Sequence, residues 1–149
     1  FSIGDRIDVA CALSINDFND QRTVSVRVIN VHPTGWRQGE NLRAAAAFEA
    51  VMRGEEAADA TDVFTRNDLA GVYRYLRDNS PIKTGTDGMY YILRKKLDGY
   101  TYFKHLAALQ IMRELELMED MQPEGFAIKN GEKKVELEHS QTFRRLQKG

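Results

Sequence analysis

Two stretches near the beginning of the chain alternate apolar and polar side chains, and they constrain the fold most. Residues 7–15 (IDVACALSI) and 22–31 (RTVSVRVINV) place every second side chain on one face, which is the pattern of a half-buried β-strand. The connection between them is rich in Asn and Asp, whose side chains favour turns. The pattern therefore predicts a β-hairpin. Because an isolated hairpin is marginal in water, we expect it to need a partner surface.

Composition excludes several classes of protein. The 149 residues, of which 42% are apolar and 29% charged, fit one mid-sized or two small folded domains. The single cysteine, Cys11, excludes an internal disulfide and a cysteine-based zinc site, and it is typical of a reducing cytosol. No apolar run of about 18 residues and no apolar leader occurs, so we expect a cytoplasmic chain without a membrane partner. The chain begins with Phe1 rather than Met, which suggests a fragment.

The middle of the chain predicts a linker. Residues 40–53 have the composition of a helix, which Gly54 would end, and an acidic stretch without bulky side chains follows. We therefore divide the chain into a hairpin at 1–33, a helical linker at 34–62 and a further segment at 63–149.

The segment at 63–149 predicts three helices and a second hairpin. Thr65 and Asp68 form a variant of the capping box. Helical periodicity predicts helices over about 66–78, 87–97 and 102–118. The Asn130-Gly131 pair within FAIKNGEKKVELE is a strong hairpin signal. Three helices followed by a hairpin is the order of a winged helix-turn-helix, so the expected fold class is α+β with a winged-helix-like module.

No catalytic constellation is apparent. The three histidines, His32, His105 and His139, lie far apart without a second His or Cys at ligand spacing. We interpret each as an ordinary surface or core residue. No zinc-protease, nucleophile-elbow or P-loop motif occurs. We therefore expect neither a catalytic residue nor a metal ligand in this chain.

Four carboxylates cluster near the end of the predicted third helix, where negative charge opposes the helix dipole. They are Glu114, Glu116, Glu119 and Asp120. The cluster is either a site for a cation or basic partner, or a solvated acidic helix end.

The predicted third helix is a poor candidate for binding DNA. One face carries an apolar stripe that must meet a core, formed by Ala108, Ile111, Met112, Leu115 and Met118. The opposite face shows His105, Leu109, Arg113 and Glu116, so it offers one Arg against one Glu. Each phosphate that a protein neutralises requires a net cation. The candidate cations for nucleic acid or a partner lie elsewhere, at Arg66, Arg74, Arg77, Arg94, Lys95, Lys96, Lys133 and Lys134. They form either a binding surface or solvated helix faces.

The first hairpin offers a second candidate surface. Phe18 and Asn19 lie at the predicted turn, and Arg22 and Arg27 follow in the second strand. An aromatic ring beside cations suits single-stranded nucleic acid, which is bound through base stacking and backbone charge. Phe18 as an ordinary anchor of the turn is the alternative.

The beginning of the chain resembles the closing hairpin of the oligonucleotide-binding barrel in bacterial single-stranded-DNA-specific exonucleases of the RecJ type. Gly4-Asp5, Asn16, Phe18 and Asn19 match the family's segment, whereas Asp20 stands where Gly is common. The second half is similar to the C-terminal module of these enzymes in Gram-positive bacteria, through TRNDLAGVYRYLR and the late SQTFRRL run.

The resemblance implies a parent enzyme of the DHH phosphoesterase superfamily, a hydrolase that degrades single-stranded DNA from the 5′ end in DNA repair and recombination. That enzyme uses Mn²⁺ or Mg²⁺ in an Asp-His-His core, and no such triplet occurs in this chain. The chain is thus expected to be a non-catalytic C-terminal segment without a cofactor of its own, with a partial barrel hairpin at 1–33. The implied partners are single-stranded DNA, single-stranded-DNA-binding protein and the parent's catalytic domains. The alternatives are a winged-helix transcriptional regulator and a structural appendage on the catalytic core.

Overall fold

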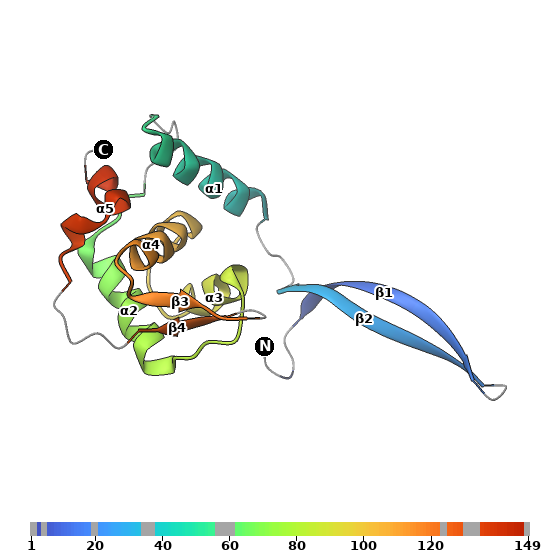
Figure 1. The fold of residues 1–149 in the computed structure, drawn as a ribbon. Helices are drawn as coiled ribbons and strands as arrows, with labels where there is room; N and C mark the ends of the chain where they lie inside the picture. Colours follow the sequence, from blue (N-terminus) through green and yellow to red (C-terminus); the bar gives the residue numbers. More distant parts are fainter. Residues whose placement is uncertain are drawn as a thin grey trace. The chain divides into compact units, whose positions relative to one another are not determined.

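The computed structural model forms two compact units, residues 1–38 and 39–149 (Figure 1). It describes residues 3, 6–18, 21–33, 38–55, 62–122, 125–129 and 135–147. The described strands form a two-stranded hairpin and a small three-stranded sheet, and neither closes into a barrel. None of the described helices has the length and apolar character needed to span a bilayer.

The first unit contains the predicted hairpin, which is confirmed. Strand β1 (Ile7–Phe18) pairs antiparallel with β2 (Gln21–Pro33), with one irregularity in register between Ala10 and Cys11. The strands are longer than the alternating pattern indicated, so Phe18, which the sequence placed at the turn, lies at the end of β1. Cross-strand side-chain bonds extend the ladder, because Asn16 Nδ2 donates to Ser25 Oγ at 2.6 Å.

The second unit contains the remaining helices and a small sheet. The α-helices are α1 (Gln38–Arg53), α2 (Arg66–Asn79), α3 (Thr86–Leu93), α4 (Tyr102–Glu114) and α5 (Gln141–Leu146), and a short 3₁₀ helix spans Leu137–His139. The predicted capping box is confirmed, since Asp68 N donates to Thr65 Oγ1 and Thr65 N donates to the Asp68 carboxylate. Gly54, at φ +81°, follows α1 as the sequence indicated.

The second hairpin lies earlier in the chain than the sequence indicated, which is a correction. Strand β3 (Met118–Asp120) pairs with β4 (Phe126–Ile128), and Met121 N donates to Gly125 O at 2.9 Å across the turn. The predicted turn at Asn130-Gly131 lies outside the described residues. Beyond it, Leu137–His139 is helical, where the sequence indicated a strand.

Two backbone positions explain the shift. Glu116 adopts φ +55°, so the chain reverses just after α4 and Met118 begins a strand where the sequence indicated the end of a helix. Gly125 adopts φ +147°, and a Cβ there would lie 2.5 Å from the Ile82 carbonyl oxygen. Only glycine allows this approach, through which Ile82 and Phe126 exchange two backbone hydrogen bonds at 2.8 Å. Ile82 thereby adds a third strand position beside β4.

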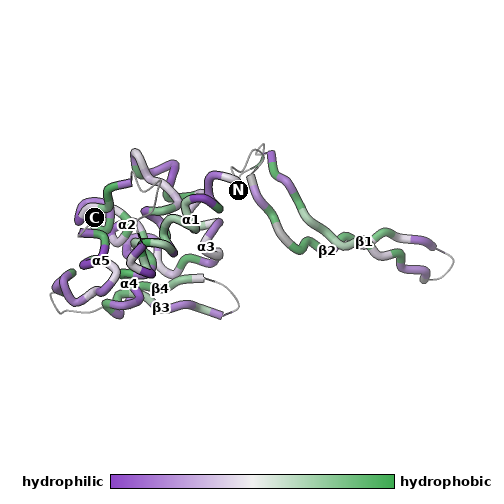
Figure 2. Tube along the Cα trace, turned by 90° about the horizontal axis from the view of Figure 1, so that it is seen from above, coloured by the Kyte–Doolittle hydropathy of each residue, from purple (hydrophilic) through white to green (hydrophobic). Residues whose placement is uncertain are grey.

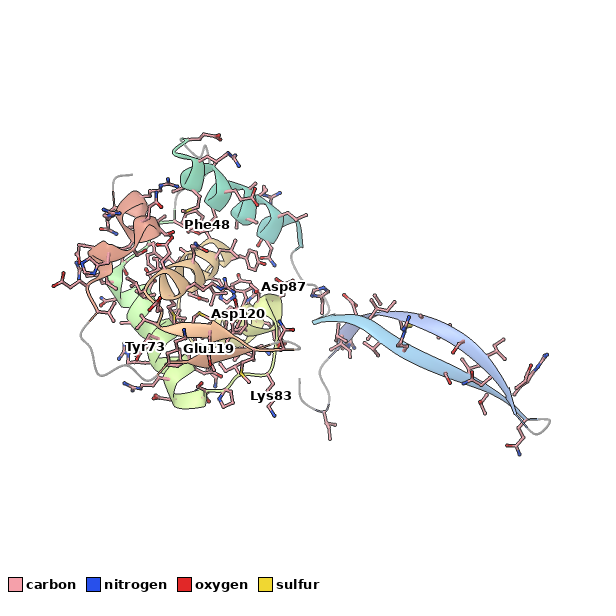
Figure 3. All side chains as sticks on the ribbon, viewed as in Figure 1. Phe48, Tyr73, Lys83, Asp87, Glu119 and Asp120 are labelled. Atoms are coloured by element: carbon pink, nitrogen blue, oxygen red, sulfur yellow. The ribbon has the colours of Figure 1, made fainter. Side chains whose placement is uncertain are left out.

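Helix α4 is the centre of the core. Its predicted apolar stripe is buried at Ala108, Ile111 and Met112, but His105 and Leu109, which the sequence placed on the opposite face, are buried as well. The reason is that α4 is covered from several sides: Thr86 and Tyr90 of α3 enclose His105, and Phe48 of α1 meets Phe103 edge-to-face at a centroid distance of 5.9 Å (Figures 1 and 3). Helix α1, which the sequence suggested as part of a linker, therefore belongs to the second unit.

His105 is fully buried in a hydrogen-bonded aromatic cluster. Its Nε2 lies 2.9 Å from the Thr86 carbonyl oxygen, which can only accept, so Nε2 carries the proton and Nδ1 accepts from the Tyr100 hydroxyl at 3.1 Å. Tyr90 and Tyr102 pack around the ring. Burial lowers the pKa of His105 to about 4, which keeps the imidazole neutral. The interpretation of His105 as an ordinary surface or core residue is confirmed, and the structure places it in the core.

Glu114, at the end of α4, holds the C-terminal helix. Its carboxylate accepts hydrogen bonds from Ser140 Oγ at 2.6 Å, Thr142 Oγ1 at 2.7 Å and Thr142 N at 3.1 Å. Partial burial raises the pKa of Glu114, but these bonds outweigh burial and hold the pKa below its usual value. Its neighbour Asp120 is also engaged, in two bonds with Arg113. Glu114 and Asp120 therefore have a structural role in the acidic cluster, because both carboxylates form hydrogen bonds within the unit.

We expect Glu114→Gln to lower the free energy of unfolding by about 1–3 kcal/mol, because an amide has one acceptor oxygen and no charge. Urea denaturation at pH 7 measures the change. Glu119→Gln, an exposed carboxylate on β3, is the matched control and should leave the midpoint unchanged. Equal midpoints for the two variants would contradict the role given to Glu114. The Glu114 contribution is present at neutral pH and is lost as the pH falls through its lowered pKa.

We expect stability to fall as the pH drops below 6.5, because the unfolded imidazole of His105 gains a proton there while the folded one resists protonation down to about pH 4. Between pH 6.5 and about pH 5 this linkage removes on the order of 1–2 kcal/mol. Thermal unfolding across that range measures it. His105→Gln should flatten the dependence, and His139→Gln, an exposed histidine, should not. If both variants keep the wild-type slope, His105 is not the responsible group.

Candidate nucleic-acid interface

The hairpin of the first unit has two faces of opposite character. The register places Cys11 opposite Val28, Leu13 opposite Val26 and Ile15 opposite Val24, so these side chains share one face. They are exposed, with Leu13 and Ile15 each at 68%, and green, hydrophobic segments recur along both strands in Figure 2. Contiguous exposed apolar side chains of this kind are typical of a surface that packs against another.

The opposite face of the hairpin is mostly polar. The register places Ser14 opposite Ser25, Asn16 opposite Thr23 and Ala12 opposite Arg27. Arg27 is exposed, and none of the described residues pairs with its guanidinium. This face therefore offers one free cation among small hydrogen-bonding side chains.

The other residues of the hairpin that the sequence suggested for binding nucleic acid are Arg22, Phe18 and Asn19. Arg22 lies on the apolar face of the ladder and forms an ion pair with Asp17 at 3.0 Å, which offsets its charge. Phe18 ends β1 opposite Gln21, and Asn19 follows. The side chain of Phe18 and the whole of Asn19 lie outside the described residues, so their proposed role in stacking stays a prediction.

Two of the three candidate cations of α2 are already paired. Arg66 forms an ion pair with Glu138, and its guanidinium lies 5.5 Å from the centroid of the Phe143 ring. Arg77 pairs with Asp78 at 3.0 Å. Arg74 is exposed and donates from Nε to its own helix, at the Ala70 carbonyl oxygen. The stripe that the sequence suggested on α2 is thus reduced to one cation without a carboxylate.

The three candidates after α3 lie together. Arg94, Lys95 and Lys96 are exposed in the turn that follows the helix, and we call them the basic turn. The Arg94 guanidinium lies 5.8 Å from the Tyr90 ring centroid, and the Lys95 ammonium lies 4.1 Å from that of Tyr91. No described carboxylate lies within 4.0 Å of any of the three. Among the described residues of this unit, the basic turn is the longest run of successive cations without a carboxylate partner.

The remaining two candidates, Lys133 and Lys134, lie outside the described residues. Lys129, just after β4, is described and exposed. The described candidates divide into the polar face of the hairpin in the first unit and, in the second unit, the basic turn, Arg74 on α2, and the ion-paired Arg66 and Arg77.

A pocket that the sequence did not predict lies beside α2. Its volume is about 270 Å³, and its lining is largely apolar, with Leu69 and Tyr73 of α2 facing Leu117 and Leu137. Arg66 also lines it, but that cation already holds Glu138. The lining comes from three separate segments of the chain, so no local motif could have revealed it.

No group of three or more His, Cys, Asp or Glu side chains in the described part of the chain could hold a metal ion. The Mn²⁺ or Mg²⁺ that the resemblance assigns to the parent enzyme therefore has no fitting ligand set among these residues.

Comparison of the chain with protein-family models, with curated proteins and with solved structures found no match.

Proposed function

We propose that the chain is the non-catalytic C-terminal segment of a 5′–3′ single-stranded-DNA exonuclease of the RecJ type, acting in DNA repair and recombination, and that it binds single-stranded DNA. The observation that carries the proposal is the two-faced hairpin. Its exposed apolar face fits the interior of an oligonucleotide-binding barrel, whose remaining strands would cover it. Its polar face, with Arg27 among Ser, Thr and Asn side chains, would then lie on the outside, where such barrels bind nucleic acid.

The second unit fits a winged-helix-like module. Helix α2, the strand position at Ile82, α3, α4 and the β3–β4 hairpin follow one another in winged-helix order. In winged-helix and helix-turn-helix regulators, the third helix of this order enters the major groove.

The burial of α4 disfavours the alternative of a transcriptional regulator. An exposed recognition helix requires one free polar face, whereas α4 is buried at His105 and Leu109 as well as along its apolar stripe. Helix α1 also packs against it through Phe48. We therefore assign the second unit to support and to additional contacts, and not to sequence-specific reading of a duplex. A protein partner such as single-stranded-DNA-binding protein, and packing against the parent's catalytic domains, are further parts of the proposal.

The chain should bind single-stranded DNA more tightly than duplex. Fluorescence anisotropy with a labelled oligothymidine of about 20 nucleotides, and with a duplex of equal length, measures this. We expect the logarithm of affinity to fall with the logarithm of salt at a slope of about −1.4 or steeper, which corresponds to two or more phosphates. Tighter, sequence-dependent binding to duplex would reject the proposal in favour of a regulator.

Arg27→Gln should weaken binding of the single strand and make the salt slope less steep by about 0.7, the value for one phosphate contact. Arg43→Gln, which removes the same charge from an exposed position on α1, is the control and should change neither quantity. Equal effects of the two variants would mean that net charge, and not the polar face of the hairpin, drives binding.

The chain should not cleave DNA. A 5′-labelled single strand incubated with the chain and Mn²⁺ should remain intact, because the chain contains no Asp-His-His triplet. Metal-dependent cleavage that stays with the chain through a second purification column would overturn the non-catalytic assignment.

A further inference from the structure

We propose that the basic turn, together with Arg74, is a second and separate contact for single-stranded DNA, which binds its phosphate backbone on the second unit. This inference rests on the proposed function for its ligand, but it concerns a different surface from the hairpin. It assigns to the second unit a direct part in holding the strand.

The backbone of the basic turn is well ordered by hydrogen bonds. Arg94 N donates to Tyr90 O, and both Lys96 N and Leu97 N donate to Leu93 O, each at 2.9 Å. The turn therefore continues directly from α3 and presents three successive cations from a fixed backbone. A fixed backbone limits the conformational entropy that the turn loses on binding.

The side chains of the turn are positioned by aromatic rings, which leave their charges available. Lys95 Nζ donates to the Tyr91 hydroxyl at 2.6 Å and lies over the same ring. Arg94 lies over Tyr90, which is itself buried in the His105 cluster. Neither ring carries a negative charge, so these contacts orient the cations without neutralising them.

Three successive cations without a carboxylate partner among the described residues set this turn apart within the second unit. Ion pairs neutralise five of the unit's other described cations, Arg53, Arg66, Arg77, Lys104 and Arg113, and the described cations that remain without one, such as Arg74 and Lys129, do not form a run of three. Three adjacent like charges repel one another, and an external polyanion relieves that repulsion. One charge per nucleotide makes a phosphate backbone a suitable counterpart.

Arg74 extends the surface from the turn onto α2. Gly71 lies against the residue that follows the basic turn, since a Cβ on Gly71 would lie 3.3 Å from the Leu97 side chain. Arg74 is three residues further along α2, and residues three apart are neighbours on a helix surface. It therefore lies within one turn of the position on α2 that meets Leu97, and it adds a fourth cation without a described carboxylate partner.

The test compares two double variants of the full chain that remove the same net charge. Lys95→Gln with Lys96→Gln removes two cations of the basic turn. Arg53→Gln with Arg77→Gln, the control, removes two exposed cations that pair with Glu55 and Asp78. Oligothymidine anisotropy is measured between about 50 and 200 mM NaCl, and thermal unfolding verifies that both variants are folded.

We expect the turn variant to make the salt slope less steep by about 1.4, which corresponds to two phosphates on a single strand, and the control to leave the slope close to wild type. Equal slopes for the two variants would overturn the inference. If the wild type prefers single strands but the turn variant binds normally, the inference fails and the proposed function stands. If the wild type shows no preference for single strands, the proposed function is overturned, and the inference is overturned with it.

An acidic peptide is the competing ligand for the same surface. Oligoglutamate of matched charge is added to the complex of the wild type with oligothymidine. We expect it to displace the strand only at a large molar excess. If oligoglutamate binds the wild type more tightly than DNA and loses that binding in the turn variant, the surface belongs to a protein partner and the inference is overturned.

Discussion

The second unit depends on the enclosure of α4, because this helix contacts or anchors most of the other elements. His105 ties it to the first residue of α3, Glu114 ties it to the start of α5, and Phe103 receives Phe48 from α1. A buried helix of this kind must satisfy its polar groups internally, and it does so through the neutral imidazole and the hydrogen-bonded carboxylate. The ionisable side chains of His105 and Glu114 on α4 therefore have structural roles.

The same enclosure determines where a ligand can bind. With α4 surrounded, the charge for the proposed binding of nucleic acid would come from the periphery of the unit, where the described cations without a carboxylate partner include the basic turn after α3 and Arg74 on α2. The hairpin unit contributes differently, through a mostly polar face with one free arginine. Two modest surfaces on linked units would suit the proposed single-stranded ligand, since contacts on linked modules combine through effective concentration.

Local patterns predicted much of the fold but little of the candidate site. The alternating strands and the Thr65–Asp68 cap are encoded by neighbouring residues, and both were confirmed. The β3–β4 hairpin was missed because it depends on the backbone of Glu116 and on the close approach of Gly125 to a distant strand. The sequence identified the cations, but which of them are neutralised depends on tertiary ion pairs such as Arg66 with Glu138.

Cys11 lies on the exposed apolar face of the hairpin and is the chain's single thiol. Its rate of alkylation would therefore report on the state of this face in a way that no binding assay does. A thiol on an open ribbon reacts freely with a maleimide, whereas a thiol enclosed by further strands is protected. Cys11 is thus an intrinsic chemical probe of whether other strands pack on the apolar face of the hairpin.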